Sequence, residues 1–265
     1  MRFFAFVSLF VLSGCAVLSG LSSLDVGSDA GAPDAASDVA VSVDASDADA
    51  RPRPCVDAGV ELCDDFDTFK LGELWDPGAS PDPKGKLELV TDRAVSPTHS
   101  LHSAMGPVSV GPAYAALTKT FAGAWRDVVV DAEMWLAKPN VTSPNKGAGL
   151  VTIYLASNKG AAGSVLFAGY DYVGQSIVSN EGNLSYSEGP PIPLDRWVHV
   201  HLEVRPSNKS IVLVLDQAKA EVIGVFPSPT VADNPRITVT VGLQAFDGPT
   251  DTLDVRFDDV KVDLQ

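Results

Sequence analysis

The sequence has little positive charge. Its 19 lysines and arginines are outnumbered by 34 aspartates and glutamates, so the formal net charge is -15. The basic residues are scattered, and no cluster of them occurs along the chain. Because proteins bind nucleic acids through a basic footprint on the phosphates, nucleic acids and other anionic polymers are poor candidate partners.

A long hydrophobic run is also missing. The apolar stretch from Phe3 to Leu12 spans ten residues, whereas a helix that crosses a bilayer needs about 20. Arg2 before this stretch and small residues after it give the three-part layout of a secretory signal. Residues 1–14 are therefore predicted to be a signal peptide rather than a membrane-spanning segment.

The motif Leu12-Ser13-Gly14-Cys15, which begins at the last residue of the apolar stretch, resembles the lipobox of bacterial lipoproteins. This resemblance implies cleavage before Cys15 and acylation of its thiol and of its new amino group. Stable anchoring takes more than one acyl chain, which such a cysteine carries. Ala16 is not the aspartate that retains many lipoproteins in the inner membrane, so the resemblance implies the outer membrane or the cell surface. The alternative is ordinary secretion with Cys15 removed.

The motifs of several enzyme classes are absent. There is no phosphate-binding loop, no nucleophile elbow and no histidine cluster with zinc spacing.

Cysteine is scarce as well. With Cys15 lipidated, Cys55 and Cys63 remain as a pair and are predicted to form a disulfide in an oxidising compartment. The alternative, two ligands of a metal site, lacks nearby partners because the four histidines lie far along the chain.

Residues 15–54 form a stretch rich in alanine, serine and aspartate, without any aromatic residue. Such a composition cannot bury enough apolar surface to offset the entropy lost on ordering. The stretch is predicted to be a disordered tether between the lipidated cysteine and a domain that spans residues 55–265.

From Cys55 onward, short runs rich in β-forming residues alternate with glycine, proline, asparagine and aspartate, and no helical period is sustained. Regularly spaced strands of this kind indicate an all-β sandwich or barrel. The predicted strands are Leu62 to Phe66, Lys86 to Asp92, Ser100 to Met105, Tyr114 to Phe121, Val128 to Leu136, Leu150 to Ala156, Ser164 to Tyr172, Ser176 to Ser179, Trp197 to Arg205, Ser210 to Asp216, Glu221 to Val225, Ile237 to Phe246 and Leu253 to Val262.

The order of several motifs resembles concanavalin A-like (laminin-G-like) jelly rolls. They are Cys63-Asp64-Asp65-Phe66-Asp67 followed by Trp75, then Ser96-Pro97-Thr98-His99-Ser100-Leu101, later Asp195-Arg196-Trp197-Val198-His199-Val200, and finally Phe257-Asp258-Asp259-Val260-Lys261-Val262. The resemblance implies a two-sheet antiparallel β-sandwich with one concave sheet and with its terminal strands side by side.

Adjacent terminal strands would bring two acidic segments together. Carboxylates of the first and the last strand could then converge on calcium, which accepts six to eight oxygen ligands. The predicted ligands of this structural Ca²⁺ are Asp64, Asp65, Asp67, Asp258 and Asp259. The alternative is that these aspartates solvate edge strands and discourage edge pairing.

A second candidate site follows from strand alternation. Along Val128 to Leu136 the apolar positions alternate with Asp131, Glu133 and Trp135, and Thr152 shares a face with Tyr154 on a later strand. Aromatic rings beside carboxylates are typical of carbohydrate sites. A groove for carbohydrate is therefore predicted, lined by Glu133, Trp135, Tyr154, Tyr170 and Tyr172. The alternative is that the aromatic residues are core and the acids are solvated.

Catalytic patterns of this fold are not matched. Glycoside hydrolases of the fold use two glutamates four or five positions apart, whereas Asp131 and Glu133 are two apart, about 7 Å along a strand. Polysaccharide lyases need a histidine and tyrosine pair with basic residues; His199, His201 and Tyr186 are present, but no arginine-rich strand is. The sequence predicts non-enzymatic binding of a glycan or another extracellular ligand. The alternatives are a hydrolase or lyase of this fold, or an envelope protein without a ligand.

Overall fold

The computed structural model describes residues 55, 59–77, 85–107, 113–138, 147–158, 160–169, 175–180, 183–223, 234–245 and 252–265. The predicted signal peptide, Cys15 and the tether lie outside the described residues. In the part of the chain that is described, the regular structure consists of strands β1 to β14. No helix in this part is long and apolar enough to cross a membrane.

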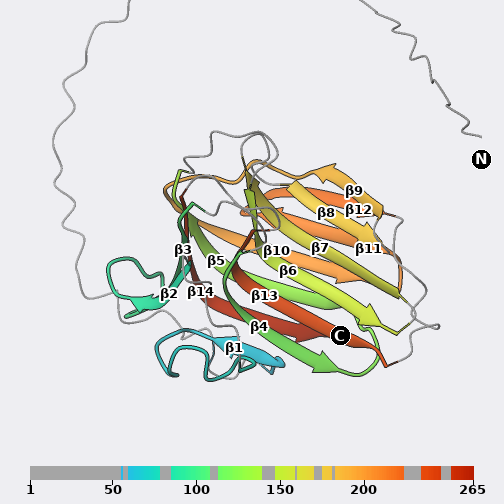
Figure 1. Cartoon of the computed structure of the whole chain (residues 1–265), viewed down its shortest axis with the longest axis horizontal. Coiled ribbons are helices and arrows are strands. Elements are labelled where there is room, and N and C mark those ends of the chain that lie inside the picture. Colours follow the sequence, from blue (N-terminus) through green and yellow to red (C-terminus); the bar gives the residue numbers. More distant parts are fainter. Residues whose placement is uncertain are drawn as a thin grey trace, which may run out of the picture. The chain divides into compact units, whose positions relative to one another are not determined.

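The strands form two antiparallel sheets (Figure 1). The eight-stranded sheet, called sheet A, has the order β12 (Ala218–Ile223), β11 (Ser210–Leu215), β10 (Trp197–Arg205), β5 (Val128–Leu136), β14 (Leu253–Leu264), β3 (Ser100–Met105) and β2 (Gly85–Val90), with β1 (Leu62–Asp64) paired to β14. The six-stranded sheet, called sheet B, has the order β4 (Ala113–Ala122), β13 (Arg236–Ala245), β6 (Gly147–Ser157), β7 (Gly160–Gly169), β8 (Gln175–Asn180) and β9 (Asn183–Glu188). The predicted all-β sandwich is confirmed.

The hydrophobic core fills the space between the two sheets. Every second residue of β5, from Val128 to Leu136, is at most 1% exposed, and β10 follows the same alternation. Sheet B contributes inward-facing residues of β13 such as Ile237 and Val239. Burial of apolar surface stabilises a fold by about 25 cal/mol per Å². It is the main force that holds the two sheets together.

The predicted disulfide closes the N-terminal segment of the domain. Cys55 and Cys63 are bonded, with their Cα atoms 5.4 Å apart. β1 begins one residue before Cys63 and pairs with the last strand, so that Asp64 lies opposite Val260. The predicted proximity of the first and last acidic segments is therefore confirmed.

The first strand is shorter than predicted, since it ends at Asp64 rather than at Phe66. The side chain of Asp65 explains this end. Its Oδ1 accepts hydrogen bonds from the backbone N–H groups of Asp67 and Thr68, which turns the chain away from the sheet. Asp65 and Asp67 thus lie in a turn and do not alternate along a strand.

One strand was not predicted. β9 consists of six mostly polar residues, Asn183–Glu188, and pairs with β8 across a short connection. Its sequence shows little of the apolar enrichment that marks buried strands. Its existence depends on pairing with β8, which no local pattern reveals.

Candidate functional site

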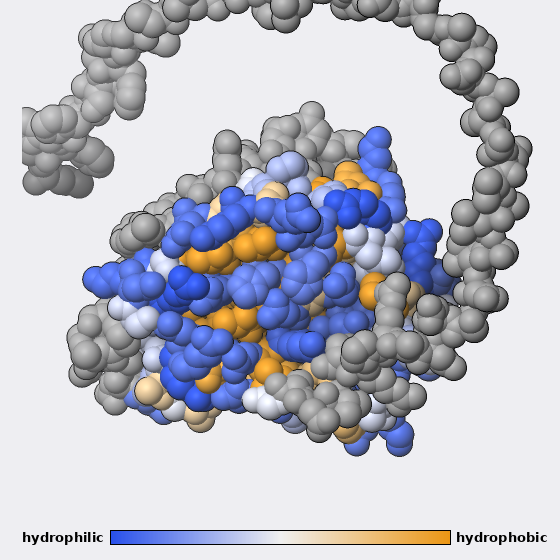
Figure 2. Space-filling model, turned by 180° about the vertical axis from the view of Figure 1, so that it is seen from behind, coloured by the Kyte–Doolittle hydropathy of each residue, from blue (hydrophilic) through white to orange (hydrophobic). Residues whose placement is uncertain are grey.

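Of the five residues predicted to line one groove, the three that the structure describes belong to opposite sheets of the sandwich. Glu133 and Trp135 belong to β5 in sheet A, whereas Tyr154 belongs to β6 in sheet B. The prediction of a single groove is therefore wrong for these three residues, because two strands that are consecutive in the chain lie in different layers. Tyr170 and Tyr172 lie outside the described residues. Figure 2, seen from behind, shows a mostly hydrophilic face crossed by hydrophobic bands.

Trp135 is not an open platform for a sugar. It is 7% exposed, and the guanidinium carbon of Arg93 lies 4.1 Å from the centroid of its ring. The guanidinium carbon of Arg256, on the adjacent strand β14, lies 5.1 Å from the same centroid. Arg256 also forms an ion pair with Asp92 at 3.0 Å. The ring is therefore engaged in cation–π contacts that stabilise this part of sheet A.

Two histidines of β10 face two acids of β5 on the outer side of sheet A. His199 lies opposite Glu133, and His201 lies opposite Asp131. The His199 ring nitrogens are 3.3 Å from Asp131 Oδ1 and 3.2 Å from Glu133 Oε1. Hydrogen bonds to Asp131 and Glu133 raise the pKa of His199 to about 10. This imidazole is therefore protonated at neutral pH and is a poor proton acceptor.

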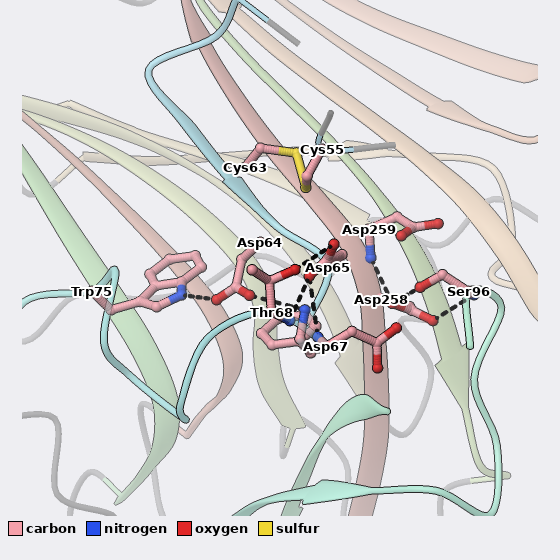
Figure 3. Close-up of a disulfide and its surroundings, with 11 residues drawn as sticks. Cys55, Cys63, Asp64, Asp65, Asp67, Thr68, Trp75, Ser96, Asp258 and Asp259 are labelled. Carbon is pink, nitrogen blue, oxygen red and sulfur yellow. Dashed lines mark hydrogen bonds between the residues drawn. A yellow bond between two sulfur atoms is a disulfide. The ribbon is translucent and has the colours of Figure 1, made fainter. Parts of the chain in front are cut away.

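Three of the aspartates predicted to bind calcium make separate contacts (Figure 3). Asp64 Oδ2 accepts a hydrogen bond from Trp75 Nε1 at 2.8 Å. Asp65 Oδ1 accepts one from the backbone N–H of Asp67 at 3.1 Å. Asp67 Oδ1 in turn accepts one from the backbone N–H of Thr98 at 2.5 Å. These carboxylates hold the turn after β1 and attach it to the loop before β3.

Asp258 and Asp259 lie at a register shift in β14, opposite β5. Asp258 is fully buried, and its Oδ2 accepts hydrogen bonds from the backbone N–H groups of Val95 and Ser96 at 2.7 and 3.0 Å. Burial, with the neighbouring carboxylate of Asp259, raises the pKa of Asp258 to about 7. Burial also raises the pKa of Asp259, and the carboxylates of Glu133 and Asp65 add to this effect.

Some of these acidic side chains are compatible with a bound divalent cation, and others are not. Asp259 Oδ1 is buried without a hydrogen-bond partner, and a cation beside it would offset the repulsion from neighbouring carboxylates. Asp64 and Asp67, by contrast, already direct oxygens at protein donors. Among the described residues, no group of three or more acidic, histidine or cysteine side chains is arranged to hold a metal ion. Calcium at this place stays a prediction.

The outer face of sheet B carries two exposed tyrosines. Tyr114 on β4 is 49% exposed, and Tyr154 on β6 is 44% exposed. The strand between them is β13 (Figure 1), where Tyr114 lies opposite Gln244 and Tyr154 lies opposite Thr238. Gln244 and Thr238 are six positions apart, about 20 Å along a strand. The two rings therefore flank a stretch of the face that is longer than a single sugar.

Hydroxyl and amide groups fill the stretch between the two tyrosines. They pair across neighbouring strands: Thr118 with Thr240 at 3.2 Å, Thr120 with Thr238 at 3.5 Å, and Thr152 with Gln244 at 3.3 Å. Thr152 donates to the amide oxygen of Gln244, whose amide nitrogen carries two further N–H donors. Thr240 is buried, whereas Thr120 is exposed and Thr118, Thr152, Thr238 and Gln244 are partly exposed. These accessible groups can exchange hydrogen bonds with a polyhydroxylated ligand.

Sequence reasoning found this face only in part. It placed Thr152 and Tyr154 together, but it missed Tyr114 and Gln244. A signal for Tyr114 was available, because Tyr114, Thr118 and Thr120 share one parity along β4, and buried Ala115 and Leu117 take the other. Gln244 gave no comparable signal, since a register shift between Val241 and Gln244 interrupts the pairing of β13 with β6.

The sequence itself matches no protein-family model and no curated protein. The fold is similar to the crystal structure of an endo-beta-1,4-glucuronan lyase from the fungus Trichoderma reesei, with a TM-score of 0.61 and 16% sequence identity over 78% of this chain and 96% of the lyase. It is also similar to the cellulose induced protein Cip1, with a TM-score of 0.53 and 19% identity over 76% of this chain and 96% of that protein. A carbohydrate-binding module, CBM66 from Bacillus subtilis, matches with a TM-score of 0.37 and 12% identity over 68% of this chain and 95% of the module. The two-sheet topology and the likeness to the first two of these structures show that the fold of the chain is a jelly-roll β-sandwich.

Proposed function

We propose that this chain binds glycan through the outer face of sheet B and does not cleave it. The observation that carries the proposal is the placement of half-exposed Tyr114 and Tyr154 at the ends of a row of hydroxyl and amide side chains. Aromatic rings pack against the C–H faces of sugars, and the polar groups fix orientation by hydrogen bonding. The likeness to a glucuronan lyase supports a glycan as the ligand class for a fold of this kind.

The residue types on this face favour binding over cleavage. Glycoside hydrolysis requires a pair of carboxyl groups at the scissile bond. Among the described outward-facing residues of β4, β13 and β6, there is no carboxylate and no imidazole. On the opposite face, Asp131 and Glu133 are both hydrogen-bonded to a protonated His199. That arrangement leaves His199 unsuited to removing a proton from a sugar.

A glycan array tests the proposal. The full chain is compared with Tyr114→Ala and Tyr154→Ala, and with Phe69→Ala as the matched control, because Phe69 is an aromatic residue with 38% exposure on a different part of the surface. We expect both tyrosine variants to lose signal and the control to keep it. Equal signal from all four proteins would overturn the proposed face. Release of reducing sugar or of unsaturated products would instead indicate an enzyme.

We also propose that Cys15 anchors the chain to the outer membrane or cell surface through lipid. The support is the lipobox-like Leu12-Ser13-Gly14-Cys15 after a short apolar stretch. In cells, the chain should incorporate a labelled fatty acid and sediment with the outer membrane, whereas Cys15→Ser should do neither. A soluble, unlabelled wild-type protein would contradict the anchor.

A further inference from the structure

The face proposed to bind glycan carries one charged side chain among its described outward-facing residues on β4, β13 and β6, namely Arg236. It is the first residue of β13 and is exposed. Two positions further along β13 lies Thr238, which is opposite Tyr154. Two positions correspond to about 7 Å along a strand. The guanidinium group and the tyrosine ring are therefore within reach of the same sugar or of adjacent sugars.

The neighbours of Arg236 leave it uncovered. Its register partners are Ala122 on β4 and Ala156 on β6, whose methyl groups are too short to shield a guanidinium group. Within the described ranges, the side chain of Arg236 makes no hydrogen bond and no ion pair.

Arginines elsewhere on the domain are engaged differently. Arg256 forms an ion pair with Asp92, and Arg196 forms one with Asp216. Arg205 is held by Glu203 on its own strand. The charge of Arg236, by contrast, is available to a ligand that lies on the face of sheet B.

We infer that Arg236 determines specificity by binding the carboxylate of one sugar unit beside Tyr154. This inference rests on the proposed function. A guanidinium group matches a carboxylate with two parallel hydrogen bonds, which neutral hydroxyls cannot reproduce. The remaining described side chains of the face are uncharged, and the chain carries a net charge of -15. The ligand class is therefore a glycan of neutral units with a single acidic unit, because a polymer charged at every unit is repelled.

Calorimetric titration of the full chain with three matched tetrasaccharides tests this inference. All three share a β-1,4-linked backbone: one contains only glucose, the second has one glucuronate, and the third has glucuronate at every unit. We expect the second to bind most tightly. Arg236→Gln should weaken that ligand roughly three- to tenfold, as for one exposed charge-assisted contact, and should leave the glucose ligand unchanged. Arg236→Lys should retain part of the preference.

The outcomes separate this inference from the proposed function. If the glucose ligand binds and Arg236→Gln weakens all ligands alike, Arg236 has only a structural role and the inference is overturned. Tightest binding of the fully acidic ligand would overturn it as well. If the wild-type chain binds none of the three, the proposed function fails together with the inference.

Discussion

Tyr154 on β6 lies against Gly163 on β7, its register partner. A Cβ atom built on Gly163 would be 3.1 Å from Cδ2 of the Tyr154 ring. This distance is tighter than an ordinary van der Waals contact, so a larger residue at position 163 would displace the ring. The glycine thereby sets the position of one of the two aromatic residues proposed to bind glycan.

The first prediction concerns Gly163→Val. Valine has a higher strand propensity than glycine, but its side chain pushes the Tyr154 ring out of place. We expect glycan affinity to fall several-fold while the melting temperature stays the same or rises. Titration and thermal unfolding of the same preparations check this. In a Tyr154→Ala background, Gly163→Val should cause no further loss of affinity, since the two changes act on one contact. Additive losses would show that Gly163 acts elsewhere.

The second prediction concerns pH. The pKa of His199 is raised from 6.5 to about 10 by its hydrogen bonds to Asp131 and Glu133. A group with a raised folded-state pKa stabilises the fold fully below its unfolded pKa, and this stabilisation is lost as pH rises through the folded pKa. We therefore expect the melting temperature to fall between about pH 6.5 and pH 10. His199→Gln should flatten this fall, and NMR should find the wild-type imidazole still protonated at pH 8. An unchanged profile in the variant would contradict the ion-pair geometry.

The third prediction concerns Trp135. Its ring is buried between sheet A and the guanidinium groups of Arg93 and Arg256. We expect Trp135→Ala to lower the free energy of unfolding by about 3–5 kcal/mol, as for other buried aromatic truncations. Glycan affinity of the folded fraction should not change, because the proposed site is on sheet B. Denaturant titration combined with binding measurements separates the two effects. A loss of glycan affinity without a loss of stability would contradict this prediction and would indicate that Trp135 contacts the ligand.

Strand alternation predicted the side-chain faces well because it is a local property. Each inward residue of β5 from Val128 to Leu136 is buried, as the period of two predicts. Which of the two sheets a strand joins is not a local property. β5 pairs with β10 and β14, while the next strand, β6, pairs with β13 and β7 in the other sheet. The groove that combined Glu133 with Tyr154 failed for this reason.

The neighbours of Trp135 show a second limit of sequence reasoning. Arg93 and Arg256 are separated by more than half the chain, yet both contact the same ring. Strand pairing places Arg256 beside Trp135, and the connection between β2 and β3 brings Arg93 over it. The sequence marks Trp135 as outward-facing, and it does face away from the core. Only the tertiary structure shows that two guanidinium groups already cover the outward side of this ring.

The last prediction concerns calcium at the acidic segment of β14. Asp258 and Asp259 have raised pKa values through burial, and Asp259 Oδ1 is buried without a hydrogen-bond partner. A bound divalent cation would offset these costs, and a ligand that binds only the folded state raises stability by mass action. We expect added Ca²⁺ to raise the melting temperature of the full chain and a chelator to lower it.

Asp259→Asn is the matched variant for calcium. It keeps the size of the side chain and removes one negative charge, so it should abolish the response to Ca²⁺ and leave the protein folded. Removing repulsion from Asp258 should make this variant at least as stable as the wild type in chelator. Thermal unfolding at matched ionic strength, with Mg²⁺ in place of Ca²⁺ as a further comparison, measures each of these effects. A wild-type melting temperature that is the same with Ca²⁺ and with chelator would exclude the site, and the role of Asp258 would then be to hold the loop at Val95 and Ser96.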